Sequence, residues 1–117
     1  MKIWKFIVIT LLVAVVAGCA INNKSFLSRN ANFSEGQKLV EQGQYEVGLQ
    51  KIEQALREEP ESKEIRAVMI RLSDEIATKL LFIAENYRFS GDLANSEREY
   101  LRILNMFPSH ERAKEGL

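Results

Sequence analysis

Two stretches of the chain resemble each other at a constant spacing, and this internal repeat limits the folds open to the chain more than any other feature. The stretches are EQGQYEVGLQKIEQALREEP, residues 41–60, and FSGDLANSEREYLRILNMFP, residues 89–108. Six pairs of positions match at an offset of 48 residues: Gly43 with Gly91, Tyr45 with Leu93, Gly48 with Ser96, Ile52 with Tyr100, Leu56 with Leu104, and Pro60 with Pro108. One offset over six pairs indicates two copies of one structural unit.

Each copy has the pattern of two helices that are joined by a glycine turn and ended by a proline. Apolar residues three or four positions apart, such as Ile52, Ala55 and Leu56, mark one buried face of the second helix. We predict helices at about 34–42, 45–58, 62–89 and 93–106, and the start of a fifth helix that Ser109 caps. The sequence therefore predicts an all-α fold.

The spacing of the glycine, aromatic, small and proline residues resembles the tetratricopeptide repeat (TPR). In the second copy the matching residues are Leu80, Ile83, Ala84, Tyr87, Gly91, Ser96, Tyr100 and Pro108. In the first copy they are Gly36, Leu39, Gly43, Tyr45, Gly48, Ala55 and Pro60. Glu35 stands where the family has a large apolar residue, so we expect the first helix to fray. The resemblance covers residues 32–108 and implies an α-solenoid of paired helices.

The second copy begins 48 residues after the first, whereas a standard TPR unit repeats after about 34 residues. The chain therefore has about 14 extra residues between the two copies. The extra residues lie in ESKEIRAVMIRLSDEI, residues 61–76, which contain neither proline nor glycine. One helical face continues through them: Ile65, Val68, Leu72, Ile76, Leu80, Ile83 and Tyr87. We therefore expect one elongated helix and no added loop. Because helix-repeat stacks need about three units, we expect the domain, residues 33–117, to be completed by another subunit or by a longer polypeptide.

The first residues have the layout of a bacterial secretory signal. Lys2 and Lys5 precede the apolar run FIVITLLVAVV, residues 6–16. This run is shorter than the roughly 20 residues that a membrane-spanning helix needs. The small residue Gly18 and the only cysteine, Cys19, follow it. The alternative to a cleaved signal is a short membrane helix whose cysteine stays unmodified.

The sequence Val16-Ala17-Gly18-Cys19 resembles the lipobox of bacterial lipoproteins. The resemblance implies that residues 1–18 are a signal peptide, cut between Gly18 and Cys19, and that Cys19 is acylated. Two or three acyl chains hold a protein at a membrane without a spanning helix. Because alanine and not aspartate follows Cys19, the family pattern in Gram-negative cells implies the outer membrane, facing the periplasm. Residues 19–32 would then form the lipidated cysteine and a polar tether.

The composition argues against several classes of function. Sixteen basic and sixteen acidic residues are scattered without a block of either sign, which is unlike the basic surface of a nucleic-acid binder. The only histidine, His110, stands among charged residues, and the chain has no glycine loop for a phosphate. Metal sites and catalytic triads need several partners that this sequence does not offer. We therefore expect no enzyme activity, no metal, no cofactor and no small-molecule substrate.

In the TPR family the first helix of each pair lines a groove that takes extended or helical peptides. By that resemblance, the partner-binding residues are Phe33, Gln37, Val40 and Glu41 in the first copy, and Leu81, Phe82, Glu85, Arg88 and Phe89 in the second. Phe82 and Phe89 lie outside the apolar face of the long helix, so they either anchor a partner or pack against structure beyond this chain. The clamp by which some family members hold a terminal carboxylate is absent at these positions.

The complete layout, a lipobox, a short tether and two paired-helix copies, resembles the lipoprotein N-terminus of certain secretins. Secretins are the outer-membrane rings of type II secretion and type IV pilus systems. The resemblance implies a tethered scaffold for protein–protein interaction, with secretion or pilus components or further copies of itself as partners. The alternative is a free-standing lipoprotein of the assembly-factor or pilotin type, which chaperones another outer-membrane protein.

Overall fold

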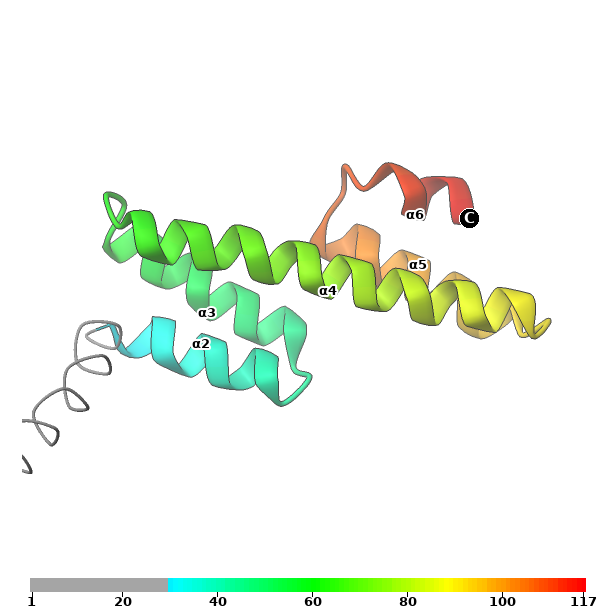
Figure 1. The fold of residues 1–117 in the computed structure, drawn as a ribbon, viewed down its shortest axis with the longest axis horizontal. Helices are drawn as coiled ribbons and strands as arrows, with labels where there is room; N and C mark the ends of the chain where they lie inside the picture. The colour runs from blue at the N-terminus through cyan, green and yellow to red at the C-terminus, as the bar shows by residue number, and fades with distance from the viewer. Residues whose placement is uncertain (1–29) are drawn as a thin grey trace, which may run out of the picture. The chain divides into compact units, whose positions relative to one another are not determined.

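The computed structural model describes residues 30–117 (Figure 1). These residues form five helices and no strand: α2 (Ala31–Glu41), α3 (Tyr45–Glu58), α4 (Lys63–Phe89), α5 (Leu93–Met106) and α6 (Glu111–Gly116). The predicted all-α fold is confirmed, and so is the elongated third helix. The predicted signal peptide, the cleavage site at Gly18 and Cys19, and the tether up to residue 29 lie outside the described residues.

The helix bounds follow the sequence pattern, except at the first helix. α3 and α5 have the predicted bounds, and α4 starts one residue after its predicted start because Ser62 is its cap. α2 begins at Ala31, so the expectation that the tether reaches residue 32 is wrong. The expected fraying is not seen, because Phe33 is only 2% exposed and Glu35 forms an ion pair with Lys51 of α3 at 3.0 Å.

The 48-residue repeat is also present in the backbone hydrogen bonds of the turns. Gly43 and Gly91 have φ angles of 81° and 84°, which glycine adopts more readily than other residues. In the first copy, backbone N–H groups donate to carbonyl oxygens from Gly43 to Val40, Gln44 to Leu39, Glu59 to Ala55, and Ser62 to Glu59. The second copy has the same four bonds 48 residues later: Gly91 to Arg88, Asp92 to Tyr87, Phe107 to Ile103, and His110 to Phe107. The sequence repeat is therefore a repeat of local structure.

The start of α6 repeats the start of α4. The Ser62 hydroxyl accepts a hydrogen bond from the Ile65 N–H at 3.3 Å, and His110 Nδ1 accepts one from the Ala113 N–H at 3.1 Å. The prediction that Ser109 caps the last helix is wrong by one residue, because Ser109 still lies in the turn. His110 is the cap, at the position equivalent to Ser62.

Small residues set the spacing within both helix pairs. Gly36 of α2 faces Gly48 of α3, and a Cβ atom added at Gly36 would lie 2.8 Å from the Gly48 carbonyl oxygen. At the equivalent crossing of α4 and α5, the Ser96 hydroxyl donates a hydrogen bond to the Ala84 carbonyl oxygen at 2.9 Å. Each pair of helices can therefore approach closely, as the small residues in the repeat predict.

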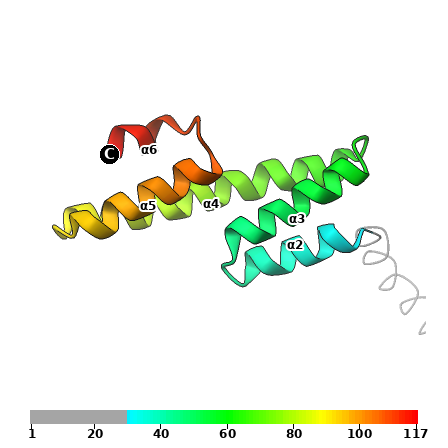
Figure 2. The same cartoon turned by 180° about the vertical axis from the view of Figure 1, so that it is seen from behind.

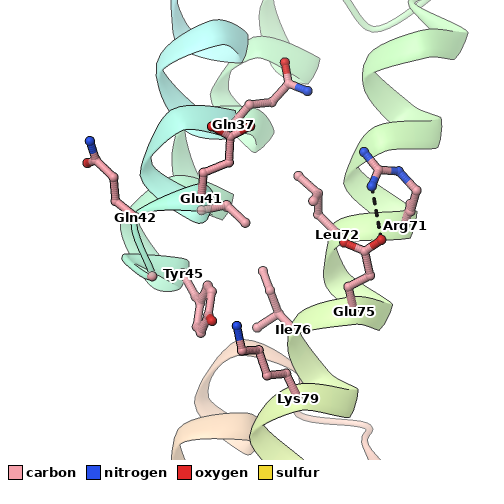
Figure 3. Close-up of a pocket in the computed structure, with 11 residues that line it drawn as sticks. Gln37, Glu41, Gln42, Tyr45, Arg71, Leu72, Glu75, Ile76 and Lys79 are labelled. Carbon is pink, nitrogen blue, oxygen red and sulfur yellow. Dashed lines mark hydrogen bonds and ion pairs between the residues drawn. The ribbon is translucent and has the colours of Figure 1, made fainter.

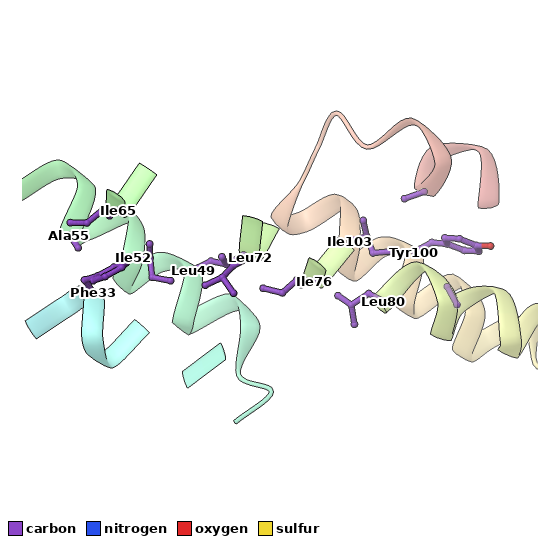
Figure 4. Packing of buried hydrophobic residues seen from close by; sticks show 12 residues of the cluster. Phe33, Leu49, Ile52, Ala55, Ile65, Leu72, Ile76, Leu80, Tyr100 and Ile103 are labelled. Carbon is purple, nitrogen blue, oxygen red and sulfur yellow. The ribbon is translucent and has the colours of Figure 1, made fainter. Parts of the chain in front are cut away.

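The core runs along α4, which packs against α3 of the first pair and against α5, its partner in the second pair (Figure 4). α3 lies along its first part and α5 along its second part, on the same side of α4 (Figures 1 and 2). Of the predicted apolar face, Ile65, Leu72, Ile76 and Leu80 are buried, and Val68, Ile83 and Tyr87 are partly buried. One continuous helix therefore supplies the core of two pairs.

Candidate functional site

A groove of about 500 Å³ lies between the C-terminal half of α2 and the middle of α4 (Figure 3). The α2 side and its turn contribute Gln37, Val40, Glu41, Gln42, Gly43 and Tyr45. The α4 side contributes Arg71, Leu72, Glu75, Ile76 and Lys79. We call this site the α2–α4 groove.

The deepest part of the α2–α4 groove is apolar. Leu72 and Ile76 are 8% and 2% exposed and belong to the core, and the partly buried Val40 packs against the same core. These side chains are held by the packing of α4 on α3, so the floor is preformed. A preformed apolar floor suits an apolar side chain of a ligand.

The rims of the α2–α4 groove are polar and carry both charges. The exposed Glu41 stands on the α2 rim. On the α4 rim, Arg71 Nη1 lies 3.1 Å from Glu75 Oε1, and the Lys79 ammonium lies 5.9 Å from the centroid of the Tyr45 ring. Figure 3 shows the two rims facing each other across the groove. Such rims offer donors and acceptors to a peptide backbone.

Three of the four residues predicted from the first copy line this groove, namely Gln37, Val40 and Glu41. The prediction that Phe33 also lines it is wrong. Phe33 and Gly36 are the buried residues of α2, so this face of the helix packs into the core. Phe33 therefore holds α2 in place and is not available to a ligand.

The residues predicted from the second copy lie elsewhere. Glu85 and Arg88 line a smaller cavity of about 280 Å³ beside α6, where Glu85 Oε1 lies 2.9 Å from Arg112 Nη2. Leu81 is partly buried and packs against the core. Within residues 30–117, the two cavities share no lining residue. The predicted residues therefore do not form one groove.

Phe82 and Phe89 are both exposed, by 66% and 80% of their surface. The guanidinium carbon of Arg88 lies 5.9 Å from the centroid of the Phe89 ring. Neither ring packs inside residues 30–117, so both alternatives left open by the sequence still stand. Each ring is open to a partner or to structure outside the described residues.

Sequence reasoning missed the α4 rim of the groove. Arg71, Glu75 and Lys79 lie in or just after the extension, and none of them was among the predicted partner-binding residues. Their spacing of four residues places them along one line of the helix, beside the buried Leu72 and Ile76. The sequence therefore contained a signal for this rim, namely a polar line beside an apolar face. It contained no signal that α2 lies opposite this line.

An ion pair joins the two helix pairs at the centre of the domain. Arg102 of α5 donates hydrogen bonds to Glu46 of α3, with Nη2 3.1 Å from Oε2. The Arg102 guanidinium also lies 5.5 Å from the centroid of the Tyr45 ring. The hydrogen bond from Arg102 lowers the pKa of the Glu46 carboxyl below its ordinary value of 4.5. The charged form of Glu46 therefore favours the folded state.

This ion pair predicts a pH-dependent loss of stability. Because the pKa of Glu46 is lowered on folding, its contribution is present above about pH 4.5 and disappears as the pH falls through the folded-state value. We expect Arg102→Met to lower the free energy of unfolding by about 0.5–1 kcal/mol at pH 7, since the pair is partly exposed. Urea titrations at pH 7 and pH 3 measure the effect of Arg102→Met on the free energy of unfolding, which should be smaller at pH 3 than at pH 7.

Arg98→Met is the control for this prediction. The Arg98 side chain is 67% exposed and lies 3.9 Å from Glu99, so its removal should change stability by less than about 0.5 kcal/mol at either pH. An equal effect of Arg102→Met at pH 7 and pH 3 would show that Arg102 acts through packing and not through Glu46.

Among residues 30–117, no three or more His, Cys, Asp or Glu side chains are placed to hold a metal ion. In the same range, no helix is long and apolar enough to cross a membrane. Comparisons of the chain with protein-family models, curated proteins and solved structures found no match in any of the three.

Proposed function

We propose that this chain is a lipid-anchored, TPR-like scaffold that binds a peptide segment of a periplasmic protein at the outer membrane. The α2–α4 groove is the observation that carries the proposal. Its floor of Leu72 and Ile76 accepts apolar side chains, and its rims supply hydrogen-bond partners on both sides. Helical and extended peptides are recognised by this combination of apolar pockets and polar edges.

The repeat of hydrogen bonds and of small-residue crossings supports the TPR-like part of the proposal. Both glycine turns and both close crossings recur after 48 residues, and each belongs to a pair of antiparallel helices. The long α4 departs from a standard TPR array. In this scaffold the groove lies where the extension of α4 faces α2.

The assignment to a secretion or pilus machine rests on the layout of the sequence. The lipobox at Cys19, the short tether and the two copies follow each other as in the lipoprotein N-terminus of secretins. In this proposal the acyl chains at Cys19 hold the scaffold at the outer membrane, and the groove holds a segment of another component. The chain supplies binding and no chemistry.

The anchor is tested with the native product, taken from purified outer membranes of its own cells. We expect its mass to show loss of residues 1–18 and addition of acyl chains, and we expect Cys19→Ala to carry no acyl mass and to leave the membrane fraction. An unmodified Cys19 in the wild-type product would overturn the anchor. A product several times heavier than residues 19–117, or a detergent-resistant multimer, supports a secretin; a product of only residues 19–117 supports the pilotin-type alternative.

The groove is tested separately, by photo-crosslinking in cells. A benzoylphenylalanine residue placed at Gln37, on the groove rim, should give a discrete crosslinked product with a protein partner. The control position is Gln54, which is exposed on α3 and does not line the groove. We expect at least a fivefold stronger product from Gln37. Equal yields from both positions would contradict binding in the groove, whatever the state of Cys19.

A further inference from the structure

A further cavity, of about 480 Å³, lies among α3, α4 and α5. It is lined by Glu46, Leu49, Gln50, Glu53, Met69, Ser73, Asn105, Met106 and Phe107. We call it the α3–α5 cavity. At about 100° per residue, Met69 and Ser73 point roughly 160° away from Arg71, but only about 20° and 60° away from Ile76 on the groove floor. The α3–α5 cavity and the α2–α4 groove therefore use neighbouring faces of α4, and they share no lining residue within residues 30–117.

The extension of α4 accounts for this cavity. About 14 extra residues move α5 by about 21 Å along α4 relative to the spacing of a standard unit. Because of this shift, α3 and α5 lie along successive parts of α4 (Figure 2). The first turns of α3 then meet the last turn of α5, joined by Glu46 and Arg102. The cavity lies at this meeting point.

The walls of the α3–α5 cavity are apolar and adaptable. Leu49 is buried, while Met69, Met106 and Phe107 are partly buried and pack against the core. The chain has three methionines, and two of them line this one cavity. Methionine side chains adjust to irregular shapes, and their sulfur atoms make favourable contacts with the edges of aromatic rings. The walls are therefore suited to an aromatic side chain.

The polar edge of the α3–α5 cavity carries two carboxylates, each paired with an arginine. Among its described lining residues are two carboxylates, Glu46 and Glu53, and no lysine or arginine. Glu46 is engaged by Arg102. Glu53 lies 3.5 Å from Arg57, in a pair whose side chains are 57% and 59% exposed and which is therefore weak. Glu53 can thus change its partner at little cost, and a cationic group beside an apolar one complements this edge.

We propose that the α3–α5 cavity binds an aromatic side chain of a partner polypeptide that carries a lysine or arginine next to it. The ring lies between Met69 and Met106, and the cation lies at Glu53. Among the described residues, this site shares no lining residue with the α2–α4 groove, so the scaffold holds two segments on neighbouring faces of α4.

The test uses nuclear magnetic resonance on the full chain in lipid nanodiscs, with carbon-13 in the methionine methyl groups. Met69→Leu and Met106→Leu assign the two methyl signals, since such swaps cost little stability. The probes are acetyl-Phe-Arg-amide and acetyl-Phe-Glu-amide. We expect both methyl signals to shift, with a dissociation constant at least about threefold lower for the arginine probe, the size of an exposed ion pair.

Two carboxylate variants complete the test. Glu53→Gln should remove the preference for the arginine probe. Asp74→Asn, at an exposed carboxylate of α4 that does not line the cavity, should keep it. Unshifted methyl signals, equal binding of the two probes, or tighter binding of octanoate than of the arginine probe would each overturn the proposal. Loss of preference in Asp74→Asn would overturn the placement of the cation at Glu53.

Discussion

Thr78→Pro should lower the free energy of unfolding by about 3 kcal/mol or more, although Thr78 is exposed and lies outside the core. Proline removes the N–H that bonds to the carbonyl of Asp74, and its ring collides with that carbonyl. Thr78 lies in the middle of α4, between the part that packs on α3 and the part that packs on α5. A break there therefore separates the two helix pairs as well as weakening one helix.

Urea titration followed by far-UV circular dichroism measures this effect. We expect Thr78→Pro to unfold in a broader transition, because the two pairs no longer unfold together. Thr78→Ala is the matched control, and its stability should lie within about 0.5 kcal/mol of wild type. If Thr78→Pro unfolded like Thr78→Ala, α4 would not be one helix that both pairs share.

Tyr100→Ala should cost about 3–5 kcal/mol, the range for removing a large buried aromatic side chain. Tyr100 is only 1% exposed and is among the largest fully buried side chains of the described residues. Its ring lies directly against Gly116 of α6, where a residue with a side chain would collide with the ring. The variant thus leaves a cavity in the second pair and also removes the surface on which α6 packs.

Leu101→Ala is the control on the same helix, because Leu101 is 45% exposed. We expect it to cost less than about 1 kcal/mol. Hydrogen exchange gives a second readout. The amides of α6 should exchange faster than in wild type in Tyr100→Ala, and at the wild-type rate in Leu101→Ala. Equal stability of the two variants would contradict the burial of Tyr100.

Periodicity predicted the helices of this chain well, because the same residues determine local structure and packing. The face from Ile65 to Leu80 was visible in the sequence, and its members are buried or partly buried along α4. The two glycine turns were visible for the same reason, since a positive φ angle is a local property. Ser109 was mistaken for a cap because two adjacent polar residues, Ser109 and His110, follow a proline, and spacing alone does not choose between them.

The binding surfaces could be predicted only in part, because they depend on how the helices are placed against each other. Gln37 and Glu41 were expected in a groove and line one, but their counterparts across it come from the extension of α4. Phe33 was expected to be open to a ligand because a standard TPR register was assumed at Glu35. Phe33 is buried where α2 packs closely on α3 at Gly36 and Gly48, and this packing is a tertiary property.

The uninterrupted α4 also has a mechanical consequence. A helix of 27 residues is about 40 Å long, and it bends little over that length. The α2–α4 groove lies at the middle of α4, and Phe89 lies at its C-terminal end. A load that tilts α4 by about 5° at the groove would move a tip about 20 Å away by roughly 2 Å. Strain at the groove would therefore displace the end of α4 that carries Phe89.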